Sequence, residues 1–118
     1  MIDRIAQLVN EDAAIVRWGR HMNETFMVEV GEQQYLLAVH GGLIQSVDKG
    51  PFVMRPWRFA IRAKAECWQK FWQKIPAPGW HDLFALLRRG EVVFEGDQRV
   101  LMAHLLYLKL VLAAPRRL

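Results

Sequence analysis

The first apolar residues of the chain recur with the spacing of a helix. Apolar side chains stand at positions i, i+3, i+4 and i+7 over residues 2–9 and again over 15–22. This spacing places each group on one face of a short helix. Residues 1–23 are therefore predicted to form two short helices. Asn10 or Asp12 could cap their junction, because such side chains accept hydrogen bonds from free backbone N–H groups.

The pattern then changes to the two-residue alternation of β-strands. Segments 25–30, 34–40 and 43–48 are predicted to be consecutive strands, with turns at Gly31-Glu32 and Gly41-Gly42. Two adjacent glycines supply the positive φ angles that a tight hairpin needs. We therefore expect an antiparallel meander.

A fourth strand is predicted over residues 57–64, where apolar and basic side chains alternate. Successive side chains of a strand point to opposite faces. The expected apolar face carries Trp57, Phe59, Ile61 and Ala63, and the expected solvated, basic face carries Arg58, Ala60, Arg62 and Lys64.

Two amphipathic helices are predicted to follow the fourth strand. Residues 68–75 place Trp68, Phe71, Trp72 and Ile75 on one face, and Pro76 ends this helix. A second helix is marked by Leu83, Phe84 and Leu87. It is expected to end before Gly90, since glycine is favoured just past a helix end.

The chain is expected to close with a short strand and an unusually apolar helix. Residues 91–95 are predicted to form the fifth strand, and Asp97 is placed to cap a helix over 98–113. The four polar residues of that helix do not gather on one side. Such a helix is buried on several sides, covers a cavity or offers its outer face to another chain.

Composition and length are typical of one globular domain. The chain has 118 residues, of which 53% are hydrophobic. We divide this single domain into N-terminal helices (1–23), a four-stranded part (24–64) and covering helices with the fifth strand (65–118). The net charge of +4 slightly favours anionic partners.

The expected location is the cytoplasm. Cys67 is the only cysteine, which excludes an internal disulfide and suits a reducing compartment. The acidic start of the chain does not resemble a secretory signal. The C-terminal apolar run is interrupted by His104 and Lys109 and is shorter than the roughly 20 residues that span a bilayer. We expect no membrane span, while peripheral contact with a membrane stays open.

Residues suited to catalysis are few, so we expect no enzyme and no cofactor. Ser46, Thr25 and Cys67 are the only serine, threonine and cysteine, and none lies in a nucleophile motif. The four histidines have no metal-binding spacing. No glycine-rich phosphate loop is present.

The segment 55–74 combines six basic residues and one acidic residue with three tryptophans. Single-stranded nucleic acids bind where aromatic and basic side chains share one exposed surface. Here the predicted strand and helix place the two kinds on opposite faces, which disfavours nucleic-acid binding. Aromatic side chains lining a cavity, with basic ones at its rim, would instead suit an amphiphile with an anionic head.

The order of these elements resembles the sterol carrier protein 2 (SCP2-like) lipid-binding family, in the form of a stand-alone bacterial member. The similarity rests on residues 88–97 (RRGEVVFEGD), with the short strand and Gly-Asp before the last helix, and on Phe59-Ala60-Ile61 before the Trp68 helix. It covers roughly residues 26–112. Glu91 departs from the pattern, because a basic residue is common there.

The resemblance implies an α+β fold, a five-stranded, mostly antiparallel sheet with helices covering one face and a hydrophobic cavity between them. It further implies a non-catalytic binding or carrier protein for a fatty acyl chain, an acyl thioester, a sterol-like lipid or an isoprenoid lipid.

Candidate ligand-binding residues come from the three predicted covering helices, although a place in the core would explain each one as well. The alternative function is a protein–protein interaction module or homodimer that uses the apolar C-terminal helix. The predicted pocket residues are Trp68, Phe71, Trp72, Trp80, Phe84, Leu87, Met102, Leu105, Leu106 and Leu108, with Arg58, Arg62 and Lys64 for an anionic head group.

Overall fold

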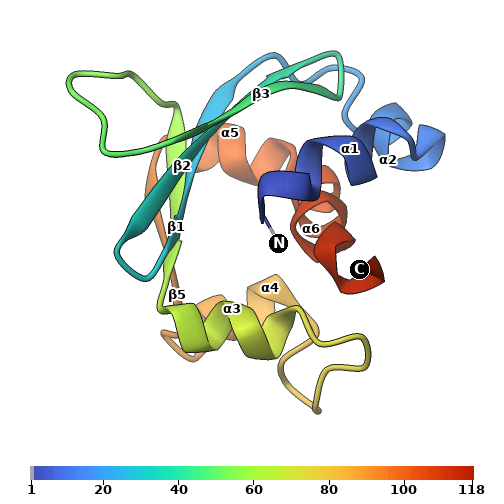
Figure 1. Ribbon diagram of the computed structural model, residues 1–118, viewed down its shortest axis with the longest axis vertical. Helices are drawn as coiled ribbons and strands as arrows, with labels where there is room; N and C mark the ends of the chain where they lie inside the picture. Colours follow the sequence, from blue (N-terminus) through green and yellow to red (C-terminus); the bar gives the residue numbers. More distant parts are fainter. Residues whose placement is uncertain (1) are drawn as a thin grey trace.

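The computed structural model describes residues 2–118 and shows a five-stranded sheet with all its helices on one face (Figure 1). The strand order is β3-β2-β1-β4-β5. Strands β1 and β4 are parallel, and all other neighbours are antiparallel. The predicted α+β class and mostly antiparallel sheet are confirmed. The strands are β1 (Thr25–Val30), β2 (Gln33–His40), β3 (Leu43–Lys49), β4 (Phe59–Ala63) and β5 (Val92–Gly96).

The helices are short, and none spans more than nine residues of the described chain. They are η1 (Ile2–Arg4), α1 (Ile5–Asn10), α2 (Ala13–Trp18), α3 (Ala65–Phe71), α4 (Leu83–Arg88), α5 (Gln98–Ala103), α6 (Leu105–Ala113) and η2 (Ala114–Arg117). Short helices gain little stability alone, so their packing on the sheet must supply most of it.

The parallel pairing of β1 with β4 results from a connection across the sheet. The chain leaves β3 at one edge, and residues 50–58 lead it to the far side of β1. Phe52 and Trp57 of this loop pack on the outer face of the sheet, which carries no helix. On the inner face, the rings of Phe26 and Phe59 stack at 5.2 Å and join the two parallel strands.

Two of the predicted helix caps are present. Asp12 accepts hydrogen bonds from the backbone N–H groups of Ala14 and Ile15, and Asp97 accepts one from Val100 at 3.1 Å. Asn10 has a different role. Its side-chain amide accepts from the backbone N–H of Ile44 at 2.8 Å and donates to the Ile44 carbonyl at 2.9 Å, which joins α1 to β3.

The predicted helix over 68–75 is wrong in its extent. Helix α3 runs from Ala65 to Phe71, and the side chain of Ile75 is 92% exposed rather than part of the buried face. A proline disfavours helical backbone in the residue before it, so Ile75 does not continue the helix into Pro76. The rest of the predicted apolar face, Trp68, Phe71 and Trp72, is buried.

The predicted single helix over 98–113 is also wrong, because it breaks at His104. The backbone there has φ −113° and ψ 21°, which separates α5 from α6. Helix α5 contacts β4, whereas α6 contacts α1 and α2. The break lets two apolar segments pack on different neighbours.

The hairpin between β2 and β3 lies against the helices. Gly42 is buried beneath α2, and its carbonyl accepts a hydrogen bond of 2.7 Å from the hydroxyl of buried Tyr107 in α6. Gly41 and Gly42 have φ angles of +59° and +82°, as the hairpin prediction requires. A Cβ on Gly42 would collide with the backbone of Val16 and Gly19, whereas one on Gly41 would meet no atom within 4 Å.

We predict that Gly42→Ala and Gly41→Ala differ strongly in stability. Both strain a left-handed backbone, which costs about 1 kcal/mol, but only Gly42→Ala adds a collision that raises the loss to about 3 kcal/mol or more. Urea unfolding followed by tryptophan fluorescence measures both. Equal losses would show that the α2 backbone does not confine Gly42.

Candidate functional site

Trp68 and Phe71 of α3 form an aromatic cluster with Trp72, the residue that follows the helix. The cluster lies between α3, the sheet and α6. The rings of Trp68 and Trp72 stack at 5.1 Å, and Phe71 meets Trp68 edge-on at 5.7 Å. Trp68 and Phe71 are fully buried and Trp72 is 7% exposed. These side chains belong to the main apolar core of the protein.

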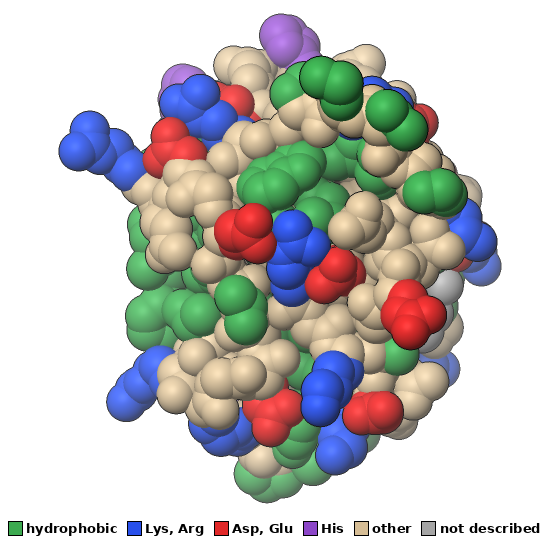
Figure 2. Space-filling model, turned by 90° about the vertical axis from the view of Figure 1, so that its left-hand side faces the viewer, with side chains coloured by type: hydrophobic (Ala, Val, Ile, Leu, Met, Phe, Trp, Pro, Cys, Tyr) green, Lys and Arg blue, Asp and Glu red, His purple; other side chains and the backbone are tan. Residues whose placement is uncertain are grey.

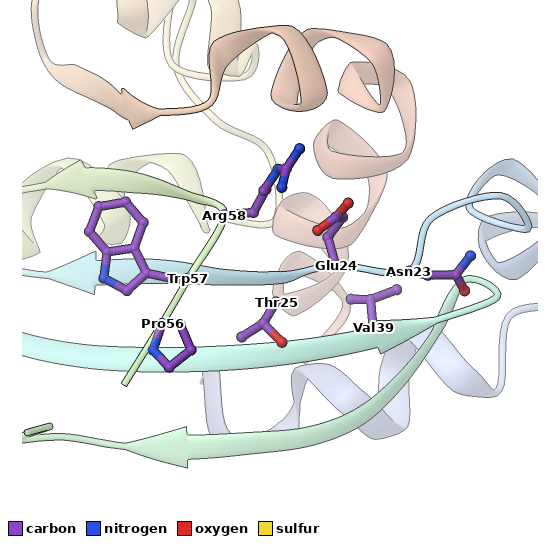
Figure 3. A pocket seen from close by; sticks show the side chains of 7 residues that line it. All are labelled: Asn23, Glu24, Thr25, Val39, Pro56, Trp57 and Arg58. Atoms are coloured by element: carbon purple, nitrogen blue, oxygen red, sulfur yellow. The ribbon is translucent and has the colours of Figure 1, made fainter. Parts of the chain in front are cut away.

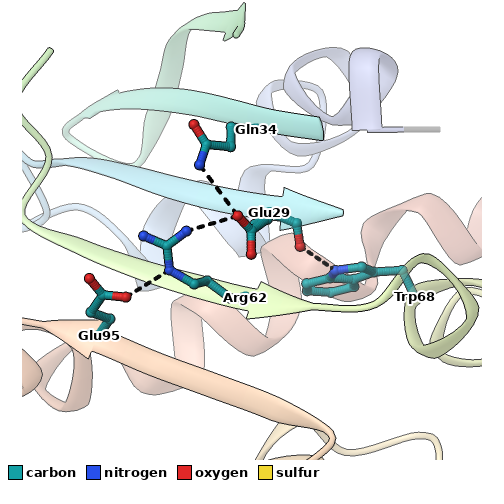
Figure 4. Close-up of polar contacts among 5 residues, drawn as sticks. All are labelled: Glu29, Gln34, Arg62, Trp68 and Glu95. Atoms are coloured by element: carbon teal, nitrogen blue, oxygen red, sulfur yellow. Dashed lines mark hydrogen bonds and ion pairs between the residues drawn. The ribbon is translucent and has the colours of Figure 1, made fainter. Parts of the chain in front are cut away.

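Each indole of the cluster uses its N–H to hold a backbone carbonyl. Trp68 donates to the Glu29 carbonyl of β1 at 2.8 Å (Figure 4), and Trp72 donates to the Leu112 carbonyl of α6 at 2.7 Å. Arg116 adds a third link, since its Nε donates to the Phe71 carbonyl at 2.7 Å. The polar atoms of the indoles are therefore satisfied, and the rest of the cluster is apolar.

Most of the predicted pocket residues belong to the same core. Leu108 is fully buried, and Trp80, Leu87 and Leu105 pack against the core while half-buried. The side chains that the structure brings together there are Trp68, Phe71, Trp72, Trp80, Leu87, Leu105 and Leu108.

Three predicted pocket residues lie apart from this core. Phe84 is half-buried, with the ammonium of Lys109 5.9 Å from its ring. Met102 and Leu106 are 45% and 57% exposed. These two point outward, so they do not line the space between sheet and helices.

The predicted basic residues lie on or beside the outer face of the sheet. Arg62 donates to Glu29 at 2.9 Å and to Glu95 at 2.7 Å (Figure 4), and Arg58 pairs with Asp97 at 3.2 Å. Burial opposes the charge of Arg62, but the two carboxylates outweigh it and raise its pKa. Both guanidinium groups are thus engaged. Within residues 2–118, the exposed Lys64 forms no ion pair.

Trp57 is on the opposite face from the predicted one. Its ring lies on the outer face, 5.8 Å from the guanidinium of Arg62, and not beside Phe59 in the core. The regular alternation starts only at Phe59, where β4 begins, so it does not fix the direction of Trp57, which lies two residues before the strand.

The outer face carries two shallow depressions that the sequence did not indicate. Figure 2 shows this face, where apolar patches alternate with neighbouring basic and acidic side chains. One depression of about 420 Å³ lies between the start of β1, the end of β2 and residues 56–58 (Figure 3). Another, of about 510 Å³, lies beside Lys64 and Gly90. Residues far apart in sequence form both, so no local pattern could reveal them.

Comparisons with known proteins establish the fold. No protein-family model matches the sequence, and no curated protein matches it either. The structure is similar to a crystal structure of sterol carrier protein 2, with a TM-score of 0.81 and 14% identity, over 99% of this chain and 94% of the other. It is also similar to UbiJ-SCP2, a ubiquinone synthesis protein, with a TM-score of 0.61 and 18% identity, over 98% and 88% of the two chains. The chain therefore has the SCP2-like fold.

The same fold also occurs inside an enzyme. The inverting sec-alkylsulfatase Pisa1 from Pseudomonas sp. matches with a TM-score of 0.57 and 16% identity, over 88% of this chain but only 16% of the enzyme. The match to sterol carrier protein 2, in contrast, spans nearly the whole of both chains. No group of three or more His, Cys, Asp or Glu side chains within residues 2–118 is arranged to hold a metal ion. In the same range, no helix is long and apolar enough to cross a bilayer.

Cys67 is a poor nucleophile in this structure. Its side chain belongs to the apolar core and is 3% exposed. Burial raises the pKa of the thiol, and the nearby charge of Glu91 raises it further. The thiol therefore remains protonated near neutral pH, whereas a thiolate is the reactive form.

We predict that Cys67 reacts with Ellman's reagent roughly a hundredfold more slowly in the native protein than in urea, because reaction requires local opening of the core. Absorbance at the wavelength of the released thiolate measures both rates. Comparable rates would show an accessible thiol and would reopen the question of a catalytic role.

Proposed function

We propose that this protein, whose chain has the SCP2-like fold along nearly its whole length, is a non-catalytic binding or carrier protein for a hydrophobic or amphiphilic small molecule. The observation that carries the proposal is the aromatic cluster of α3, which separates this helix from the sheet and α6 by side chains alone. A ligand tail that took the place of these rings would meet an apolar surface on every side.

The composition of the core supports an apolar ligand. Among residues 2–118, no polar or charged residue is buried. A hydrocarbon chain placed in this layer would meet no buried charge, and the polar contacts that it would disrupt are the indole hydrogen bonds of Trp68 and Trp72. Dispersion and burial of the chain would replace the contacts that the rings give up.

Few polar contacts resist an outward movement of α3. The hydrogen bonds from Trp68 to β1 and from Trp72 to α6 hold it, together with the bond from Arg116 to Phe71. Each contributes on the order of 1 kcal/mol net. The binding energy of a long acyl or isoprenoid chain exceeds this sum, because each buried methylene contributes about 0.8 kcal/mol.

The proposed ligand class is a fatty acyl chain, an acyl thioester, a sterol-like lipid or an isoprenoid lipid. One member of this class is a quinone precursor with an isoprenoid tail. It is included because a ubiquinone synthesis protein has the same fold. For an anionic head group, Lys64 is the candidate that forms no ion pair within residues 2–118. Arg58 and Arg62 would first have to leave their carboxylate partners.

We predict that ligand binding changes the fluorescence of the buried indoles. Delipidated protein would be titrated with palmitic acid, palmitoyl-coenzyme A and decylubiquinone. We expect the change to disappear in the double variant Trp68→Phe/Trp72→Phe, because the reporting rings touch the ligand. Native mass spectrometry of protein purified from its host would give the mass of any retained molecule.

The matched control for this titration is Trp18→Phe, since Trp18 is 57% exposed on α2, away from the cluster. This variant should retain the change. Loss of the change in Trp18→Phe alone would place the ligand elsewhere. No change with any of the three probes and no retained molecule would contradict the carrier function.

A second candidate function rests on the outward side of α5 and α6. Met102, Leu106 and Leu110 lie four residues apart and are 45%, 57% and 38% exposed. Trp18 of α2 and Leu110 line the same shallow groove. An apolar stripe of this kind suits an isologous contact between two copies of the chain.

We predict for this alternative that Leu106→Glu converts a dimer to a monomer, because it places a charge in the middle of the apolar contact. Light scattering after size-exclusion chromatography measures the mass. Ile75→Glu is the control, since it adds the same charge to a similarly exposed apolar site. A monomeric parent protein at all accessible concentrations would exclude the homodimer.

A further inference from the structure

A loop with an exposed apolar tip projects from the sheet. Residues 50–58 connect β3 to β4, and in Figure 1 this loop, drawn in green, extends beyond the sheet and away from the helices. At its tip the side chains of Val53 and Met54 are 86% and 98% exposed. Side chains of this type are normally removed from water, so two of them at a projecting tip point to an apolar partner.

The base of the loop is firmly attached. The N–H of Gly50 donates to the Gln34 carbonyl at 2.8 Å, and Arg55 pairs with Asp48 at 2.9 Å. Phe52 packs on the small apolar cluster of the outer face. The loop therefore keeps its apolar tip pointed outward instead of folding it back on the sheet.

Within residues 2–118, the charge of this loop that has no carboxylate partner is positive. Residues 49–58 (KGPFVMRPWR) contain three basic residues and no acidic one. Asp48 and Asp97 pair with Arg55 and Arg58, while Lys49 is exposed and forms no ion pair within residues 2–118. Long basic side chains beside an apolar tip can reach anionic head groups while the tip enters the acyl region.

We propose that Val53 and Met54 insert into the surface of a bilayer that contains anionic lipid, with Lys49 at the head groups. A protein partner fits these observations less well. A stable protein interface buries about 800 Å² on each side, and two side chains on a narrow tip supply only a fraction of that area. A bilayer accepts such a tip without a complementary surface. This inference goes beyond the carrier function and does not depend on it.

The test is co-sedimentation of the full chain with vesicles. One preparation contains phosphatidylcholine alone, and the other contains phosphatidylcholine mixed with phosphatidylglycerol. We expect binding to the mixed vesicles, and a loss of about tenfold or more in the partition coefficient for Val53→Ser/Met54→Ser, because two apolar side chains no longer leave water. Lys49→Gln should weaken binding to the mixed vesicles only.

The matched control is Ile75→Ser, which removes a 92% exposed apolar side chain from a different loop. It should bind vesicles as the parent does. Circular dichroism would show that each variant is folded, and native mass spectrometry would show whether Val53→Ser/Met54→Ser retains the same molecules as the parent. Retention with lost vesicle binding would separate the loop from the ligand site.

Three results would overturn the proposal. The first is a parent protein that binds neither kind of vesicle. The second is equal vesicle binding by the parent and by Val53→Ser/Met54→Ser. The third is a parent dimer that Val53→Ser/Met54→Ser converts to a monomer, which would assign the tip to contact between two copies of the chain.

Discussion

The attachment of α3 through two indole N–H groups is the constraint on which the helical layer depends. Trp68 and Trp72 each join a long apolar ring system to one backbone carbonyl, the first on β1 and the second on α6. The rings set the separation between α3 and its neighbours, and the hydrogen bonds set its orientation. Because an indole has only one polar atom, the layer stays apolar even where it is hydrogen-bonded.

The sheet divides the molecule into an apolar side and a charged side at β1. The carbonyl of Glu29 accepts from Trp68, while its carboxylate, on the outer face, accepts from Arg62 and Gln34 (Figure 4). The ion pairs of Arg62 with Glu29 and Glu95 link three neighbouring strands on the side that has no helix.

Much of the fold could be predicted because its signals are local. The first strand was predicted with its exact bounds, and Asp12 and Asp97 were identified as caps, since alternation and capping depend on a few adjacent residues. The aromatic face of α3 was also predicted, although Ile75 was wrongly included. For the candidate site, sequence reasoning gave the residue types and most of the buried cluster. It failed for Met102 and Leu106, because an apolar helix carries no mark of which side faces the core.

The sequence by itself determined an apolar α+β domain with a mostly antiparallel sheet and few groups suited to catalysis. The periodicity of its hydrophobic residues and its amino-acid composition suffice for this, because both are properties of the chain alone. Only the tertiary structure decided the parallel pairing of β1 with β4, the break at His104, the outward direction of Trp57 and the carboxylate partners of Arg58 and Arg62. Each of these depends on contact between segments far apart in the sequence. Such contacts are selected by the total burial and pairing of the folded chain, which no local pattern contains.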